Sequence, residues 1–242
     1  MSGNGHCDKV AAAVILGAGS SRRMNGTDKI FAPLAGRPLI SYSLTLFEEC
    51  PAVTAVVVVS PPGKEGNVRT LAEDMGCEKF KGVVAGGKER RDSAAIGLLT
   101  AAFFVPCDAA VLIHDAARPF ADCPLVRRLL GALDVADGAV PALPPTDTIK
   151  KVAAPGDEIV TTLARDELRA VQTPQAFPLA RITEAYKKAV GEKWEVTDDA
   201  AVMEKAGGRV VTVEGEADNF KITYPSDLAR AECLLSRRQD TL

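Results

Sequence analysis

Short, continuously apolar segments alternate with longer amphipathic segments along most of this chain. Segments that are apolar at every position, instead of every second one, are typical of parallel strands buried on both faces. They are rich in valine and alanine and cover residues 11–16, 54–59, 82–85, 109–113 and 138–142. The segments between them have helical length and cover residues 38–50, 64–76, 90–103 and 124–134. This alternation predicts an α/β fold with a mostly parallel, doubly wound sheet.

The pattern changes after residue 141. Residues 141–163 begin with three prolines in five positions and contain a Pro155-Gly156-Asp157 turn signal between two extended segments, 146–152 and 158–163. We therefore expect a β-hairpin arm that projects from the sheet. Beyond the arm, the sequence predicts a strand over 209–213 and helices over 178–190, 197–206 and 226–237, the last with a Ser/Asp cap.

Composition limits both the class of protein and its partners. The length of 242 residues fits a single domain, 1–242, with an elaboration. With 29 basic and 32 acidic residues, the chain has no overall positive field, so neither nucleic acid nor an anionic membrane is an expected partner. The apolar runs are too short to span a membrane and no secretion signal is visible, so we expect a cytoplasmic location.

Six scattered cysteines and two histidines argue against a zinc cassette, a disulfide framework or a histidine-rich metal site. The cysteines form no Cys-x-x-Cys pair, and the histidines stand far apart in the sequence. A metal, if one is used, is therefore expected on oxygen ligands.

A glycine-rich turn, Gly17-Ala18-Gly19, follows the first predicted strand. Ligands bind at the carboxyl ends of strands in open α/β sheets, and glycines let phosphates approach the backbone closely. Arg22, Arg23 and Lys29 follow the turn, which favours a polyphosphate site over a plain tight turn. A dinucleotide-binding fingerprint would need glycine at position 22 and an acidic residue after the second strand, so NAD binding is not expected.

Residues 82–89 resemble a P-loop, but Glu89 replaces the hydroxyl residue that would bind magnesium, which argues against an ATPase. The Gly86-Gly87 turn instead precedes a predicted helix. Its backbone and the Ser93 hydroxyl suit the recognition of a base edge, although an ordinary helix N-terminus fits equally well.

Two further groups of charged residues follow apolar segments. Asp115 stands just past a predicted strand, and Arg118 follows it, which suggests a metal or phosphate site at the same sheet edge as the glycine turn. Asp218 and Lys221 flank a short apolar segment, a pattern that taken alone indicates only a solvated face.

Seven motifs follow one another along the chain. The most characteristic is His114-Asp115-Ala116-Ala117-Arg118-Pro119. The others are the glycine turn with Arg23 and Lys29, Gly86-Gly87 with Glu89-Arg90 and Ser93, Asp147-Thr148, Thr173-Pro174-Gln175, Thr197-Asp198-Asp199-Ala200 and Asp218-Asn219-Phe220-Lys221. Their order resembles that of the 2-C-methyl-D-erythritol 4-phosphate cytidylyltransferase family over about residues 10–237.

The resemblance implies a Rossmann-like nucleotidyltransferase fold and a reaction. CTP and 2-C-methyl-D-erythritol 4-phosphate would give CDP-methylerythritol and pyrophosphate, a step of non-mevalonate isoprenoid synthesis. The attacking phosphate is already ionised at neutral pH, so no general base is needed. What the reaction needs is positive charge around the phosphates, together with Mg²⁺ that bridges the triphosphate.

The resemblance also implies roles for individual residues. The catalytic residues would be Arg23, Lys29, Arg165 and Lys221. Nucleotide contacts would come from Gly17, Ala18, Gly19, Lys29, Gly87, Lys88 and Ser93. Contacts with the sugar phosphate would come from Asp115, Thr148, Arg165, Thr173 and Lys221. Asp115 and Asp218 are the candidate metal ligands, and a dimerisation arm over about 141–172 would form a homodimer and carry Arg165 into the partner's pocket.

Two alternatives remain open at this stage. A pentitol-phosphate cytidylyltransferase, acting on ribitol phosphate, would share every nucleotide motif and differ around Thr148, Arg165 and Thr173. A non-catalytic nucleotide-binding regulator belongs to a different class and is disfavoured by Arg22 and by the missing acidic residue after the second strand.

Overall fold

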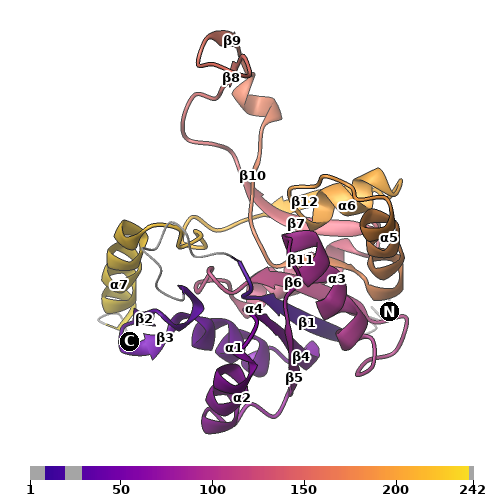
Figure 1. Ribbon diagram of the computed structural model, residues 1–242. Coiled ribbons are helices and arrows are strands. Elements are labelled where there is room, and N and C mark those ends of the chain that lie inside the picture. Colours follow the sequence, from indigo (N-terminus) through magenta and orange to yellow (C-terminus); the bar gives the residue numbers. More distant parts are fainter. Residues whose placement is uncertain (1–8, 20–28, 240–242) are drawn as a thin grey trace, which may run out of the picture.

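A mostly parallel sheet forms the centre of the protein (Figure 1). The computed structural model describes residues 9–19 and 29–239. The main sheet has eight strands in the order β10-β7-β11-β6-β1-β4-β5, and β12 pairs with β7 outside this path. Its strands are β1 (Ala11–Leu16), β4 (Val53–Ser60), β5 (Phe80–Ala85), β6 (Ala110–Asp115), β7 (Gly138–Leu143), β10 (Ala170–Val171), β11 (Gln175–Pro178) and β12 (Val210–Glu214). The predicted α/β fold is confirmed.

The central strands are buried on both faces, as their continuous apolar runs predict. Every residue of β6 is buried, and only Thr54 of β4 is exposed. The strand β6 extends as far as Asp115, so this aspartate ends the strand instead of following it. The prediction of burial for residues 82–85 is wrong, because β5 pairs only with β4 and its residues are partly or fully exposed.

The strand β11 is absent from the sequence prediction. It lies between β6 and β7 and is antiparallel to both, with Gln175 opposite Ile113 and Ala176 opposite Ala139. It has four residues and no valine or isoleucine, so its strand signal is weak. The neighbouring β10 also pairs antiparallel with β7. These two strands are the exceptions to the parallel arrangement of the sheet.

Helices cover both faces of the sheet. One face packs against α1 (Leu39–Glu49), α2 (Glu65–Asp74) and α4 (Cys123–Ala132). The other packs against α3 (Arg90–Ala101), α5 (Leu179–Gly191) and α6 (Asp199–Lys205). Each of these helices matches a helical segment predicted from the sequence.

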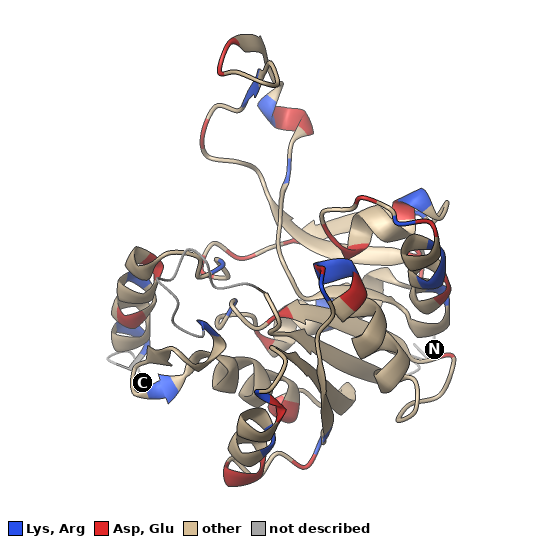
Figure 2. Ribbon diagram, in the orientation of Figure 1, with Lys and Arg blue, Asp and Glu red and all other residues tan. Residues whose placement is uncertain are grey.

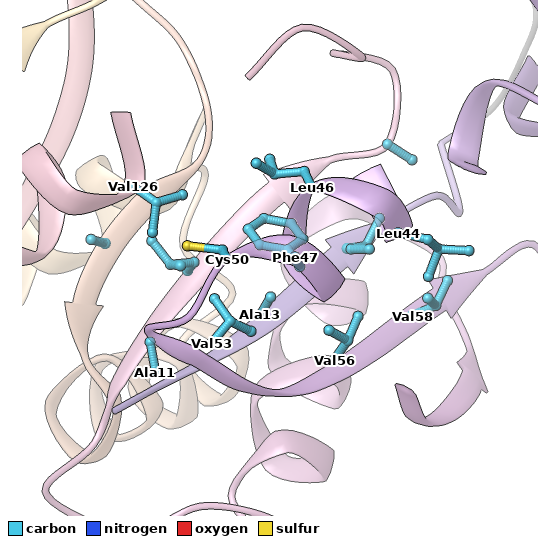
Figure 3. Packing of buried hydrophobic residues seen from close by; sticks show 14 of the residues in the cluster. Ala11, Ala13, Leu44, Leu46, Phe47, Cys50, Val53, Val56, Val58 and Val126 are labelled. Carbon is cyan, nitrogen blue, oxygen red and sulfur yellow. The ribbon is translucent and has the colours of Figure 1, made fainter. Parts of the chain in front are cut away.

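Successive residues along each central strand point alternately into the hydrophobic clusters on the two faces of the sheet. Ala13 of β1 belongs to the cluster with α1, and Val14 belongs to the cluster with α3. Figure 3 shows the first cluster, where Phe47 of α1 lies above Ala13 and Val56. This alternation explains why a helix is needed on each side of every central strand.

A glycine lets α3 approach the sheet closely. A Cβ atom on Gly97 would lie 2.5 Å from Cγ1 of Val14 and 2.8 Å from Cγ2 of Val59, closer than real carbon contacts allow. Both valines are fully buried, so neither has space to move away. Gly97 therefore sets the distance between α3 and the sheet, and with it the position of the turn before α3.

The predicted arm is present as a hairpin. Its strands are β8 (Lys150–Val152) and β9 (Ile159–Thr162), which pair antiparallel at the tip of an extension from the main body (Figure 1). The strands are shorter than the predicted segments but lie within them. Both basic and acidic positions lie along the ribbon of the arm (Figure 2). Val152 is 45% exposed, and Ile159 and Val160 are each 59% exposed. The hairpin thus presents apolar surface that its own chain does not cover.

The C-terminal helix α7 (Pro225–Gln239) packs on a third, smaller cluster that includes Phe120 and Ile222. Its first turn is fixed by the Asp227 carboxylate, which accepts hydrogen bonds from the backbone N–H groups of Thr223 and Tyr224. Two short strands beside this cluster, β2 (Pro33–Leu34) and β3 (Arg37–Pro38), form a small hairpin. Within the described ranges, no helix combines the length and apolar character needed to cross a membrane.

The packing of α3 predicts opposite effects of the same substitution at two helical glycines. We expect Gly97→Ala to lower the free energy of unfolding by about 1–3 kcal/mol, because the added methyl group overpacks the core. At Gly131 of α4 the Cβ position has no described atom within 4 Å, so Gly131→Ala should stabilise the protein by about 0.5–1 kcal/mol. Urea unfolding of both variants tests this, and equal effects would contradict the close approach of α3.

Candidate active site

A pocket of about 410 Å³ opens at the carboxyl ends of β1 and β6, beside the start of α3. This edge is where open α/β sheets bind their ligands, and the volume is typical of a small-molecule site. The pocket is lined by residues 16–19, 29–30 and 87–90 and by Ser93, Asp115, Ala117 and Lys221. Seven of the residues predicted from the sequence to contact ligands therefore meet here with Asp115 and Lys221: Gly17, Ala18, Gly19, Lys29, Gly87, Lys88 and Ser93.

Backbone from two glycine turns forms one wall of the pocket. A Cβ atom on Gly86 would lie 2.2 Å from Cβ of Ala18, so the two turns touch with almost no side chain between them. Backbone hydrogen bonds fix both turns to β4: the N–H of Gly17 donates to Val59 O at 2.7 Å and that of Gly86 to Ser60 O at 2.9 Å. Gly86 is therefore required by the packing of the two turns, whereas a Cβ atom on Gly19 would meet no described atom within 4 Å.

The Ser93 hydroxyl shapes the second turn. It accepts a hydrogen bond from the N–H of Gly87 at 3.1 Å and donates one to Glu89 O at 3.1 Å. A capping box between Glu89 and Asp92 starts α3 at the same place. Ser93 thus holds the wall of the pocket in place, in addition to lining it.

Asp115 is the central charge of the site. Its Oδ2 atom lies 2.7 Å from Nζ of Lys221, and its Oδ1 atom lies 3.8 Å from Nη2 of Arg90. Burial alone would raise the pKa of Asp115, but the positive charges of Lys221, Arg90 and Arg118 outweigh it and lower the pKa to about 2. The carboxylate is therefore ionised at neutral pH although only 13% of the side chain is exposed.

Thr173 and His114 lie behind Asp115 and do not line the pocket. The Thr173 hydroxyl accepts a hydrogen bond from the backbone N–H of Asp115 at 2.9 Å and contacts Nδ1 of His114 at 3.1 Å. Burial lowers the pKa of His114 to about 4, and the charge of Asp115 offsets only part of this effect. His114 is therefore neutral at neutral pH, and in this structure Thr173 supports Asp115 instead of facing the pocket.

Lys221 is held by the segment that precedes α7. The fully buried Asn219 donates from Nδ2 to Thr173 O at 2.9 Å. The backbone carbonyl oxygen of Asn219 accepts a hydrogen bond from Nη1 of Arg118 at 2.7 Å. The N–H of Ile222 donates to Ala117 O at 2.8 Å. These bonds on both sides of Lys221 place its ammonium group at the pocket.

Several predicted residues do not meet at this pocket. Asp218 lies outside the lining and pairs with Arg238 at 3.2 Å, so the structure does not bring it to a metal site with Asp115. Thr148 and Arg165 are exposed on the arm, where Nη2 of Arg165 donates to Oγ1 of Thr148 at 3.4 Å. Arg23 lies outside the described residues.

Sequence reasoning did not identify Arg90 as a residue of the pocket. Arg90 belongs to the Glu89-Arg90 motif of the family resemblance, but no role was assigned to it, and charge alone does not distinguish it from the adjacent Arg91. In the structure Arg90 lines the pocket, whereas Arg91 turns away and donates to the carbonyl oxygen of Trp194 at 2.7 Å. Arg90 and Arg91 differ because they point to different sides of the first turn of α3.

The charges of the pocket suit a polyanionic ligand. Lys29, Lys88, Arg90 and Lys221 line it, against the two carboxylates of Asp115 and Glu89. Across the part of the chain that the structure describes, no three His, Cys, Asp or Glu side chains gather as a metal-binding group. The arrangement can therefore bind phosphates through cations and backbone N–H groups, and a metal there would have to take most of its ligands from a substrate and water.

Comparison with known proteins agrees with this arrangement. Residues 11–237 match the family model of 2-C-methyl-D-erythritol 4-phosphate cytidylyltransferase (IspD). A relative of that name from Halalkalibacterium halodurans is 40% identical over 229 residues, which cover 94% of this chain and 98% of the relative. Another from Pelotomaculum thermopropionicum is 39% identical over 236 residues, which cover 97% of this chain and 98% of that relative.

Solved structures give the same result. The crystal structure of 2-C-methyl-D-erythritol 4-phosphate cytidylyltransferase from Thermus thermophilus is 35% identical with a TM-score of 0.72, covering 92% of this chain and 98% of that one. The crystal structure of 4-diphosphocytidyl-2C-methyl-D-erythritol synthase from Anaerococcus prevotii is 26% identical with a TM-score of 0.82, covering 95% of this chain and 97% of that one. The chain described here therefore belongs to the 2-C-methyl-D-erythritol 4-phosphate cytidylyltransferase family of nucleotidyltransferases.

Proposed function

We propose that this pocket transfers a cytidylyl group from CTP to 2-C-methyl-D-erythritol 4-phosphate. A phosphate oxygen of the sugar attacks the α-phosphorus of CTP, the bond from that phosphorus to the bridging oxygen breaks, and pyrophosphate leaves. The observation that carries the proposal is the pocket itself, in which a backbone wall and the Asp115–Lys221 pair face one another in a chain of this family. The reaction supplies isoprenoid precursors, and its highly charged substrates fit the cytoplasmic location that we propose.

The glycine turns form the nucleotide side of the pocket. The backbone N–H groups of Ala18 and Gly19 are suited to contact the phosphates. Gly17 and Gly87 line the pocket beside them, but their own N–H groups already donate to Val59 O and to the Ser93 hydroxyl. We propose that this backbone surface accepts the smaller pyrimidine base and excludes a purine. Lys88 and Ser93 complete this side.

In the proposed reaction, positively charged side chains stabilise the charge on the reacting phosphates. Lys29 begins the short helix η2 (Lys29–Phe31) at the edge of the pocket, and we assign to it the stabilisation of charge on the α-phosphate and on pyrophosphate. Arg23 belongs to the same proposal through the family motif. Lys221, fixed by Asp115, is placed to bind the attacking phosphate of the sugar. Attack by an already ionised phosphate does not require a general base, so the neutral His114 presents no difficulty.

The donor set of the pocket fits a Mg²⁺ ion that enters with the nucleotide. Magnesium keeps several waters and needs only one or two carboxylates when phosphates supply other ligands. Oδ1 of Asp115 is the suitable protein donor, because Lys221 occupies Oδ2, whereas Nη2 of Arg90 lies 3.8 Å from Oδ1, beyond hydrogen-bond distance. The low pKa of Asp115 keeps the carboxylate ionised. When bound, the ion would neutralise charge on the triphosphate. We do not extend this role to Asp218, which pairs with Arg238.

The arm supports a shared site in a homodimer. Thr148 and Arg165, the predicted acceptor residues of the arm, lie together outside the pocket of their own chain. Two-stranded hairpins are marginally stable in water, and the exposed Val152, Ile159 and Val160 need a covering surface. We propose that residues 141–172 dimerise the protein and that Arg165 completes the acceptor site of the other subunit.

Pyrophosphate release tests the substrates. With Mg²⁺ present, we expect release from CTP and 2-C-methylerythritol 4-phosphate to exceed release with ribitol phosphate. We expect ATP or GTP to replace CTP poorly, because a purine would clash with backbone that a pyrimidine can approach. Removing the metal with EDTA should stop the reaction. Faster turnover with ribitol phosphate would favour the pentitol-phosphate alternative, comparable turnover with ATP would refute pyrimidine selection, and no release with any pair would leave only a nucleotide-binding protein.

Subunit mixing tests the shared site. Lys29→Ala and Arg165→Ala should each lower the rate constant by about 100- to 1000-fold, because Lys29 stabilises developing charge and Arg165 holds the attacking phosphate in position. Exchange of subunits between the two variants should restore about a quarter of wild-type activity, since half the dimers are then mixed and each mixed dimer has one intact site. Mixed dimers, verified by mass spectrometry, that stay inactive would show that both residues serve the same subunit's site. A monomer by light scattering would refute the dimer.

A further inference from the structure

Asp199 is a fully buried carboxylate to which the proposed reaction assigns no role. It is the first residue of α6 and belongs to the Thr197-Asp198-Asp199-Ala200 motif. Its Oδ1 atom accepts hydrogen bonds from Nη1 of Arg90 at 2.9 Å and from the Tyr186 hydroxyl, and its Oδ2 atom accepts from Nη2 of Arg90 at 2.6 Å. Burying a charge this completely is costly unless each of its acceptors is satisfied, as both are here.

Arg90 connects this buried carboxylate to the pocket. It is the first residue of α3, lines the pocket, and its side chain is 34% exposed. The Nη2 atom that binds Asp199 also lies 3.8 Å from Oδ1 of Asp115, whose Oδ2 binds Lys221. Asp199, Arg90, Asp115 and Lys221 thus form a row of alternating charges that runs from the interior to the pocket.

The geometry gives Arg90 a holding role instead of a phosphate-binding role. Its guanidinium group is committed to Asp199 in a bidentate pair, the strongest arrangement that an arginine makes with a carboxylate. Its charge is therefore already balanced by a group that the ligand cannot reach. Lys221 is more exposed, at 43%, and shares only one oxygen of Asp115, so it is the cation available to the acceptor.

We propose that Asp199 and Tyr186 are positioning residues for cytidylyl transfer: they hold Arg90, and Arg90 holds Asp115 in the orientation that fixes Lys221. This inference rests on the proposed function for its substrates. Without the charge of Asp199, Arg90 is released to pair fully with Asp115 and draws that carboxylate away from Lys221. The acceptor side of the pocket then loses its fixed cation, while the backbone wall on the nucleotide side remains.

A charge-removing pair of variants tests the role of Asp199. Asp199→Asn keeps the shape of the side chain, and we expect kcat/KM for the sugar phosphate to fall by about tenfold or more while KM for CTP changes by less than about threefold. The matched control is Asp198→Asn, because Asp198 is the adjacent carboxylate but binds the N–H of Ala201 and the side chain of Gln175. This control should stay within about threefold of the wild type. Equal losses in both variants would overturn the proposal.

A double-mutant cycle shows whether Asp199 acts through Arg90. If it does, Arg90→Gln combined with Asp199→Asn should be no less active than Arg90→Gln alone, because the group that Asp199 holds is already gone. If the losses in kcat/KM of the two single variants multiply in the double variant, the proposal is overturned.

Tyr186→Phe removes only one hydrogen bond to Asp199 and should lower kcat/KM by about two- to tenfold with the same selectivity for the acceptor. It provides the test if Asp199→Asn does not fold, and an unchanged kcat/KM in Tyr186→Phe would then count against the proposal.

A crystal structure of the Asp199→Asn or Tyr186→Phe variant separates this inference from the proposed function. Wild-type turnover alone decides whether the substrates are right. In the Asp199→Asn structure we expect the guanidinium of Arg90 to move toward Asp115 and Nζ of Lys221 to lie farther than 2.7 Å from that carboxylate; Tyr186→Phe should show a smaller movement in the same direction. Unchanged positions of Arg90, Asp115 and Lys221 would refute the positioning role whichever substrates the enzyme uses.

Discussion

The ion pair between Asp115 and Lys221 is the interaction on which the rest of the site depends. A carboxylate at the buried end of β6 is strongly unfavourable unless positive charge reaches it. The cations come from distant parts of the chain: Lys221 from the segment before α7 and Arg90 from the start of α3. Thr173, from the turn before β11, fixes the backbone of Asp115. The doubly wound fold brings these segments to one sheet edge, and the burial of Asp115 keeps them there.

The central architecture follows from the sequence because its cause is local. A strand covered by helices on both faces is apolar at every position; the runs at 11–16 and 109–113 have this property, and the run at 54–59 has it except at Thr54. Parallel strands end at one edge of a sheet, so the glycine turn after β1 and Asp115 at the end of β6 are expected to meet. The hairpin arm is predicted by its turn signal. In these cases the residues carry the information within their own segment.

Features that depend on contacts between segments escape this reasoning. The strand β11 has only four residues, and it forms because β6 and β7 lie on either side of it. The choice between Arg90 and Arg91 depends on the position of Asp199, which is more than a hundred residues away. Asp218 pairs with Arg238 of α7, a contact that sequence spacing does not reveal. Thr148 and Arg165 lie outside the pocket of their own chain, so their role requires a second subunit.

The most direct test of the account is the pKa of the Asp115 carboxyl group. It can be followed by ¹³C NMR of the side-chain carboxyl between about pH 3 and pH 6. The pair with Lys221 predicts a pKa of about 2, so the group should stay ionised over nearly all of this range, and Lys221→Met should raise the pKa. A midpoint at or above the ordinary value of 3.8 in the wild type, or no change in the Lys221→Met variant, would show that Asp115 and Lys221 do not form the pair around which the site is built.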